Sequence, residues 1–449
     1  MLTGLSRVAT ALTALSQRWI PSAFAIAVIL TFVTFAIAIG AGASPREALI
    51  AWGNGFWTLL PFAMQMSLVI LTGYIVSAAP VVDRLFTRLA QVPRSPRGAV
   101  VMMALVSMAL AWFHWGLSIV GCAMFVRHVA RSQPKVDYRL LVAAAYFGMG
   151  ATWHAGLSAS APLLVATPGH FLQDRIGLIP ITRTIFHPFN LGLTVIVVAL
   201  LVVLAYVLHP READAVCIDP DALDALGRFT PPERPPATGL AVVIDHSWWL
   251  NGLIGATGLS WLEWYFGTHG FSLTLDVLNF AFLMLGILLH RSPASVLVAA
   301  EQGASLVAGV ILQFPFYAGM YGVIQGTGLS ERLGAWIAES ANPRTFPLLL
   351  YWYSGVVNYF VPSGGSKWAI EAPYLVDAAQ RLGLGVDQVV VAYAWGDMAT
   401  DLIQPFWALP LLAAARLDFR DIMGYASIVF VVYVTVVSAA FWLLPVLWS

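Results

Sequence analysis

Long apolar runs constrain the fold of this chain more than any other feature of its sequence. A helix that crosses a membrane needs roughly 20 apolar residues, because the hydrocarbon core of a bilayer is about 30 Å thick. Only 10% of the 449 residues are charged, against about 25% in soluble domains, and the mean hydropathy is +0.79. We therefore predict an all-α polytopic membrane protein, which excludes a cytosolic enzyme, a secreted disulfide scaffold and a disordered chain. The predicted helical runs are 20–41, 55–79, 98–129, 140–166, 189–209, 247–266, 273–290, 303–324, 346–379, 389–415 and 425–448.

The charged residues and the cysteines exclude further classes of protein. The 23 basic residues balance 23 acidic ones, which argues against nucleic-acid binding through net charge. Cys122 and Cys217 lie in unrelated segments and predict neither a disulfide nor a metal site. We expect no cofactor apart from a coupling cation, and the lipid bilayer as the surrounding partner.

Two apolar runs are interrupted near their middle by residues that disfavour a helix. The run 98–129 contains FHWGLS at 113–118, and the run 346–379 contains VPSGGS at 361–366. Proline followed by Ser-Gly-Gly-Ser can hardly continue a helix. We expect each run to form a re-entrant hairpin, whose tip must be surrounded by protein or water within the membrane. The alternative is a pair of short helices with a surface turn.

The second half of the chain matches the first at an offset of 248 residues. An odd number of expected crossings separates equivalent positions, so the second repeat should be inverted relative to the first. We predict a first repeat at 1–208, a cytoplasmic acidic and proline-rich linker at 209–246, and a second, inverted repeat at 247–449. Inverted repeats with interrupted helices are typical of secondary transporters. The densest match pairs Gly148, Ala151, Thr152, Pro162, Leu163 and Leu164 with Gly396, Ala399, Thr400, Pro410, Leu411 and Leu412.

The distribution of positive charge predicts the orientation. Most of the lysines and arginines fall on one side of the predicted membrane, and that side is the cytoplasm by the positive-inside rule. The N-terminus is then cytoplasmic and the C-terminus periplasmic. The first hairpin enters from the cytoplasm and the second from the exterior.

Two predicted spans carry polar groups at mid-depth. The span 148–162 holds Thr152, His154, Ser158 and Ser160. Its partner, 396–410, holds Asp397, Thr400, Asp401 and Gln404 before Pro405, which should break the helix and free backbone carbonyls. A carboxylate inside a membrane costs roughly 2.5 kcal/mol or more and predicts a functional site. Asp397 and Asp401 are therefore our candidates for binding a coupling ion, either H⁺ or Na⁺. They could instead cap a broken helix or lie nearer the surface.

The hairpin tips are the other candidates. A helix N-terminus offers free N–H groups and partial positive charge, which suit a carboxylate. We predict substrate contacts from the tips together with the polar residues of the interrupted spans. Lys367 and Glu371 are four residues apart and are expected to neutralise each other. The predicted substrate-binding residues are His114, Gly116, Ser118, Thr152, His154, Ser158, Ser160, Ser363, Gly364, Gly365, Ser366, Thr400 and Gln404.

Four segments resemble the short-chain fatty acid transporter family, of the acetoacetate/butyrate carrier type, within the ion-transporter superfamily. They are GFWTLLPFAMQMSLVILTG, QFPFYAGM, NYFVPSGGSKWAI and QPFWALPLLAAARLDFRDIMGY. The resemblance implies symport of a small carboxylate across a bacterial inner membrane. By analogy with related symporters it also implies an elevator motion and often a homodimer.

Two other functions compete with transport driven by an ion. An intramembrane serine hydrolase could use Ser158, His154 and Asp401, but GLSAS has Ser160 where the nucleophile motif needs glycine, and its context is helical. A passive carboxylate channel would need a ring of basic residues, whereas charge at mid-membrane is mostly acidic here. We therefore expect a transporter and not an enzyme.

Overall fold

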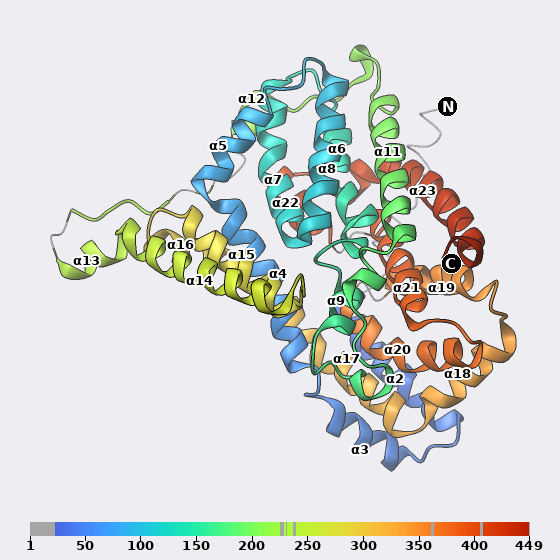
Figure 1. Cartoon of the computed structure of the whole chain (residues 1–449). Coiled ribbons are helices and arrows are strands. Elements are labelled where there is room, and N and C mark those ends of the chain that lie inside the picture. The colour runs from blue at the N-terminus through green and yellow to red at the C-terminus, as the bar shows by residue number, and fades with distance from the viewer. Residues whose placement is uncertain are drawn as a thin grey trace.

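The described residues of the computed structural model fold into helices and the segments that connect them (Figure 1). The structure describes residues 23–448 apart from 225–228, 230, 237–238, 361–362 and 405–406. The first half contains α2 (Ala23–Gly40), α3 (Pro45–Gly55), α4 (Leu60–Ala78), α5 (Pro80–Leu89), α6 (Pro96–Phe113), α7 (Trp115–Ser132), α8 (Tyr138–Ala151), η1 (Trp153–Ala155), α9 (Ser160–Ala166), α10 (Gln173–Ile176), η2 (Ile181–Arg183) and α11 (Pro188–Val207). The connecting segment contains η3 (Glu212–Asp214), α12 (Pro220–Asp224) and α13 (Leu240–Asp245). The second half contains α14 (Trp248–His269), α15 (Leu275–Leu289), α16 (Pro293–Ala304), α17 (Ala308–Gly326), α18 (Leu329–Ser340), α19 (Phe346–Phe360), α20 (Gly364–Arg381), α21 (Val386–Ala399), η4 (Thr400–Leu402), α22 (Leu409–Ala415) and α23 (Phe419–Leu447).

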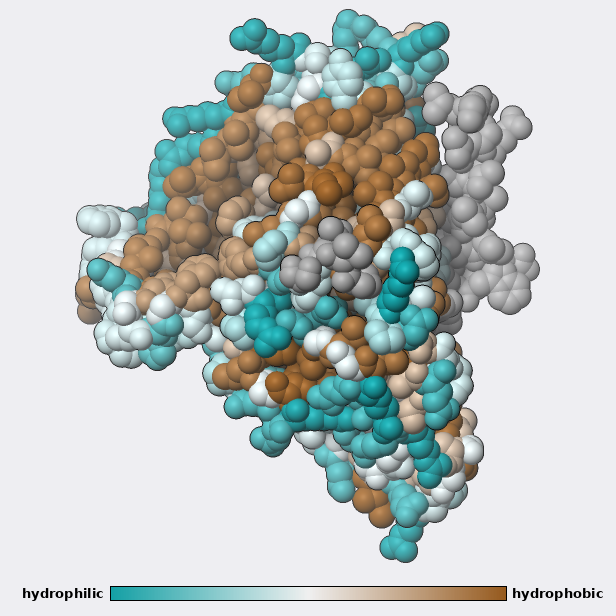
Figure 2. Space-filling view, turned by 45° about the vertical axis from the view of Figure 1, so that its right-hand side comes forward, coloured by the Kyte–Doolittle hydropathy of each residue, from teal (hydrophilic) through white to brown (hydrophobic). Residues whose placement is uncertain are grey.

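Several helices have the length and composition of membrane spans. Within the described chain, five helical segments meet both conditions, and α16 with α17 forms a sixth that bends by 50°. In an apolar 18-residue stretch of the segment 138–166, 94% of the residues are buried within the protein, against 28% in the corresponding stretch of α11. Figure 2 shows apolar side chains spread over a broad area beneath a hydrophilic cap. The prediction of a polytopic all-α membrane protein is confirmed, and the buried segment 138–166 is where a polar site can be shielded from lipid.

The helices break where the sequence predicts. A single extended residue, His114, separates α6 from α7. At the second interruption α19 ends at Phe360, and Ser363, also extended, caps α20. The arms of the first hairpin pack along each other, while α20 packs mainly on α18 and α17. How deep these tips lie in a bilayer stays a prediction.

The two predicted spans with polar groups at mid-depth, 148–162 and 396–410, are also broken in the structure. α8 ends at Ala151, and a short 3₁₀ turn leads into α9; α21 ends at Ala399, and another such turn precedes α22. The expected role of Pro405 in the second break lies outside the described residues. Most described residues at these breaks are buried, so their irregular backbone is largely surrounded by protein, as an apolar environment demands.

Helix bounds in the two halves follow the same offset as the sequence. α4 and α17 begin and end 248 residues apart, and so do α8 and α21. The halves are nevertheless packed into each other, since α17 contacts α2, α3 and α4, while α8 contacts α21 and η4. Their inverted relation and the boundaries at 208 and 247 stay predictions.

Glycine sets the position of the first tip. A Cβ added at Gly73 of α4 would lie 2.6 Å from the backbone nitrogen of Leu117 and 2.7 Å from the carbonyl carbon of Gly116. Only a residue without a side chain allows this approach, so the first turn of α7 rests directly on the backbone of α4.

Gly73→Ala should therefore lower the thermal unfolding temperature of the purified protein, because overpacking a tight core costs about 1–3 kcal/mol. The matched control is Gly192→Ala in α11, where an added Cβ meets nothing within 4 Å. Equal unfolding temperatures for the two variants, measured in the same detergent, would contradict the tight contact between α4 and α7.

Candidate functional site

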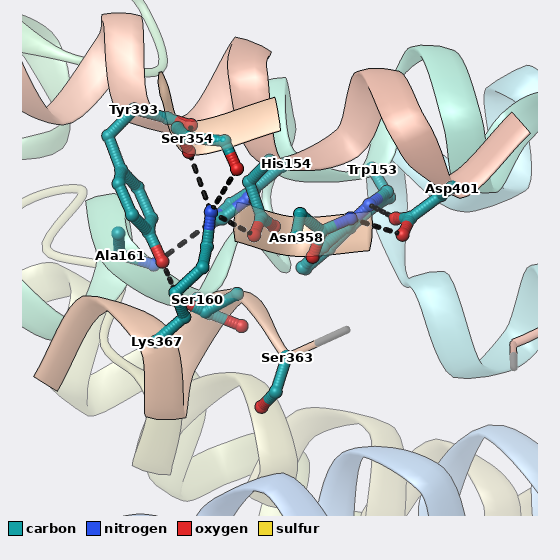
Figure 3. Close-up of polar contacts among 12 residues, drawn as sticks. Trp153, His154, Ser160, Ala161, Ser354, Asn358, Ser363, Lys367, Tyr393 and Asp401 are labelled. Atoms are coloured by element: carbon teal, nitrogen blue, oxygen red, sulfur yellow. Dashed lines mark hydrogen bonds and ion pairs between the residues drawn. The ribbon is translucent and has the colours of Figure 1, made fainter. Parts of the chain in front are cut away.

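Asp397 of α21 is fully buried in a polar cluster. Figure 3 shows Lys367, His154 and Tyr393 of this cluster pointing toward one another. Its Oδ1 atom is 3.0 Å from Nζ of Lys367 and its Oδ2 atom is 2.8 Å from Nδ1 of His154. Asp397 is therefore held between an ammonium group and an imidazole, and its attraction to Lys367 is strong because water is excluded here.

Lys367 projects from the first turn of α20 and makes three contacts to oxygen. Besides Asp397, its ammonium group donates to the carbonyl and to the hydroxyl of Ser354, both at 2.7 Å, and it lies 4.4 Å from the ring centre of Tyr393. Three oxygens match the three protons of the ammonium group. The expectation that Lys367 and Glu371 neutralise each other is wrong, because the ion pair of Lys367 is with Asp397. Glu371 is buried beside this pair, and its Oε2 has no hydrogen-bond partner within the described chain.

The hydrogen bonds of His154 define its tautomer. Nε2 accepts from the backbone N–H of Ala161 at 3.2 Å, so the ring proton is on Nδ1, which faces Asp397. The ring stacks on Trp153 with centroids 4.2 Å apart. His154 is thus a neutral donor directed at Asp397, supplied by the break after α8.

The N-terminus of α20 lies against the same carboxylate. A Cβ at Gly364 would be 2.6 Å from Oδ2 of Asp397 and 2.7 Å from Cε1 of His154. Tyr393 fixes this turn by donating its hydroxyl to the carbonyl of Gly364 at 2.6 Å. A helix N-terminus and a lysine both favour an anion, and the carboxylate that lies beside them in this structure is that of Asp397.

Asp401 is held by neutral N–H donors. Its carboxylate accepts from Nε1 of Trp153 at 3.0 Å, from Nδ2 of Asn358 at 2.8 Å and from Nε2 of Gln404 at 3.4 Å. In the part of the chain that the structure describes, no basic side chain forms an ion pair with Asp401. The two aspartates therefore differ, since Asp397 has a cationic partner and Asp401 has a shell of uncharged donors.

The polar side chains of the first tip form hydrogen bonds with backbone groups of the protein. His114 caps α7 by accepting from the N–H of Leu117 at 3.1 Å, and it packs on the ring of Phe282. The hydroxyl of Ser158 accepts from the N–H of Trp115 at 2.9 Å, and Ser118 donates to the carbonyl of Ser107 at 3.0 Å. Nε2 of His114 is buried with no hydrogen-bond partner in the described residues.

Helix α4 connects the two tips. Gly365 of the second tip packs against Phe62, since a Cβ there would lie 2.2 Å from its ring, and Gly116 of the first tip packs against Val69. Ser160 contacts the sulfur of Met66, between these two positions, at 3.6 Å. Phe62 and Val69 are two turns apart, or about 10 Å along the axis. The tips thus approach the same short stretch of α4.

Equivalent threonines fasten the broken spans of the two halves by similar hydrogen bonds. Thr152 donates to the carbonyl of Met108 at 2.8 Å, and Thr400 donates to that of Gly355 at 2.9 Å. Thr152 and Thr400 therefore join each broken span to the preceding hairpin helix.

The predicted site residues form two groups. Asp397, His154 and Gly364 meet around Lys367, with Ser363 and Ser366 bonded to each other at the same tip and Thr400, Asp401 and Gln404 one turn along. His114, Gly116, Ser118 and Ser158 form the first tip and take no part in the cluster around Asp397.

Ser354, Asn358 and Tyr393 were not predicted from the sequence, and Trp153 was predicted only as a ring that could line an apolar pocket. For Asn358 a signal was available, because it is an amide within an apolar run just before the second tip.

Comparisons with known proteins identify relatives over nearly the whole chain. A family model described as "Short chain fatty acid transporter" matches residues 4–444. Two relatives bear the name "Putative short-chain fatty acid transporter". The protein of Escherichia coli (strain K12) is 38% identical over 425 residues, covering 94% of this chain and 96% of the relative. That of Haemophilus influenzae (strain ATCC 51907 / DSM 11121 / KW20 / Rd) is 37% identical over 429 residues, with the same coverage.

Two solved structures share the fold. The YdaH transporter of Alcanivorax borkumensis has a TM-score of 0.57 at 17% identity, covering 93% of this chain and 98% of that one. MtrF of Neisseria gonorrhoeae, from a class of antimetabolite efflux pumps, has a TM-score of 0.51 at 14% identity, with 95% of each chain covered. At these identities the likeness concerns the fold alone.

Lys367→Met should destabilise the protein strongly, by about 3 kcal/mol or more, because it leaves Asp397 as an unpaired buried charge. The double variant Lys367→Met/Asp397→Asn should recover much of the loss, since both charges are then absent. Thermal unfolding of the single and double variants measures this coupling. Additive losses would show that the two side chains do not stabilise each other.

Proposed function

This chain belongs to the short-chain fatty acid transporter family, and we propose that it is a symporter of small monocarboxylates such as acetoacetate or butyrate. The matching family model and the two named relatives are described as transporters, which supports a transporter over an enzyme. The bacterial inner membrane, the cytoplasmic N-terminus, the elevator motion and the homodimer belong to the same proposal. They rest on the resemblance and on the distribution of basic residues.

The observation that carries this proposal is the pair of helix N-termini on α4. The first turns of α7 and α20 both contact this helix, and a helix start has N–H groups without carbonyl partners in its own helix. The side chains of Ser158, His114 and Ser363 accept from three of these groups, so the N–H groups of the tip glycines are the ones proposed to meet a ligand. Such groups suit the carboxylate of a small anion. Aromatic rings nearby suit a short alkyl chain. The ring centroid of Trp115 lies 6.2 Å from that of Trp153 and 5.3 Å from that of Trp407.

The charge of the substrate requires a coupling cation. Moving one anion into a cell against an inside-negative potential costs about 2.3 kcal/mol per 100 mV, so useful uptake needs a cation to travel with it. Asp397 and Asp401 are the proposed cation-binding groups. We favour H⁺ over Na⁺, because Asp401 is surrounded by N–H donors, whereas hard metal cations are bound by oxygen ligands.

A competition panel tests the substrate. Proteoliposomes that contain the protein should accumulate labelled butyrate or acetoacetate when an ion gradient is imposed, and citrate and succinate should compete poorly. Uptake that only equilibrates, with or without a gradient, would indicate a passive channel. Strong inhibition by dicarboxylates without uptake of monocarboxylates would overturn the proposed substrate class.

Separate gradients test the coupling ion. An inward proton gradient should drive accumulation in the wild-type protein, and a sodium gradient at constant pH should not. The double variant Asp397→Asn/Asp401→Asn should lose accumulation, because neither side chain can then bind and release a proton. The control is Asp377→Asn at the partly exposed end of α20, where the carboxylate pairs with Arg175 and Arg381. Wild-type accumulation by the double variant would exclude both aspartates from coupling.

A further inference from the structure

We propose that Lys367 binds the substrate carboxylate, and that Asp397 holds this place until it takes a proton. This inference rests on the proposed function and deepens it, because it assigns a binding residue and a coupling step to the cluster. Its basis is the geometry around Lys367, where one of three oxygen contacts comes from a charged group.

The side chain of Asp397 is chemically equivalent to the head of the proposed substrate. Both are single carboxylates attached to a short carbon chain, so either can satisfy the same ammonium group. The remaining contacts of Lys367, the carbonyl and the hydroxyl of Ser354, are neutral and need not change. A monocarboxylate can therefore replace Asp397 without altering the charge paired with Lys367.

The exchange is favourable only when a proton is bound. Two ionised carboxylates beside one ammonium group would leave a negative charge buried without a partner, which is costly. If Asp397 takes a proton from the solution that supplies the substrate, one O–H bond forms and the net charge is unchanged. Lys367 is then paired with the substrate, and Asp397 is neutral. One proton and one monocarboxylate bind together, so this step is electroneutral.

The surroundings of Asp397 fit a group that moves between two partners. It lies between Lys367 and His154, and the missing side chain of Gly364 lets its carboxylate approach the N-terminus of α20. His154 of η1 and Lys367 of α20 contact it, and the other charged or titratable groups near it are Glu371 of α20, Tyr393 of α21 and Asp401 of η4. His154 is neutral, so Lys367 is the cation available to a second carboxylate among these groups.

Proton uptake on substrate binding tests the exchange. Butyrate is titrated into the purified protein in weakly buffered detergent solution with a pH indicator, and its affinity is measured at several pH values. The wild-type protein should take up about one proton per butyrate bound, and its affinity should fall about tenfold per pH unit once Asp397 is ionised. Asp397→Asn should bind butyrate with no proton uptake and little dependence on pH. In proteoliposomes it should exchange labelled for unlabelled butyrate without concentrating it.

The double variant Lys367→Met/Asp397→Asn separates binding from folding, because its site contains neither charge. It should fold and bind butyrate about thirtyfold more weakly or worse, since a buried cationic partner is lost. Asp377→Asn, the control, should behave as wild type. Proton uptake by Asp397→Asn, or wild-type affinity in the double variant, would overturn the exchange. Failure of the wild-type protein to bind any short monocarboxylate would overturn the proposed function itself.

Discussion

The ion pair between Lys367 and Asp397 is the interaction on which the rest of the site depends. A lysine or an aspartate alone inside a membrane protein is costly, and each is tolerated here because the other is 3.0 Å away. Through this pair the tip of α20, the hairpin helix α19 that carries Ser354, and the broken span of α21 are joined. His154 brings the broken span of the first half to the same carboxylate. One charge pair thus assembles a centre from both halves of the chain.

Interrupted helices are the second requirement. A continuous helix satisfies its own backbone groups and offers nothing to a ligand, whereas a helix that begins inside the protein offers several N–H groups. This fold has such starts at Trp115 and Gly364, and glycines bring both against α4. Threonine hydroxyls fasten the adjoining breaks in each half. Irregular backbone is thereby enclosed by protein, as an apolar environment demands.

The sequence was sufficient for the helical class and for the position of the breaks, because apolar length and helix-breaking residues are local signals. It also singled out Asp397, Asp401 and His154, since polar groups in apolar runs are conspicuous. The structure buries all three, and their function stays a prediction. The sequence failed for Lys367, whose four-residue spacing to Glu371 suggested the wrong partner. The true partner is 30 positions away, on a helix whose approach depends on the turn at Gly364. The unequal packing of the two hairpins also has no local signal, because it depends on how α20 meets α17 and α18.

A structure determined with butyrate bound, at a pH that supports uptake, tests the central claim most directly. We predict that the butyrate carboxylate lies within hydrogen-bond distance of Nζ of Lys367, with Asp397 displaced from it. Butyrate bound elsewhere, with the ion pair between Lys367 and Asp397 intact, would contradict the claim that these two carboxylates exchange at one site.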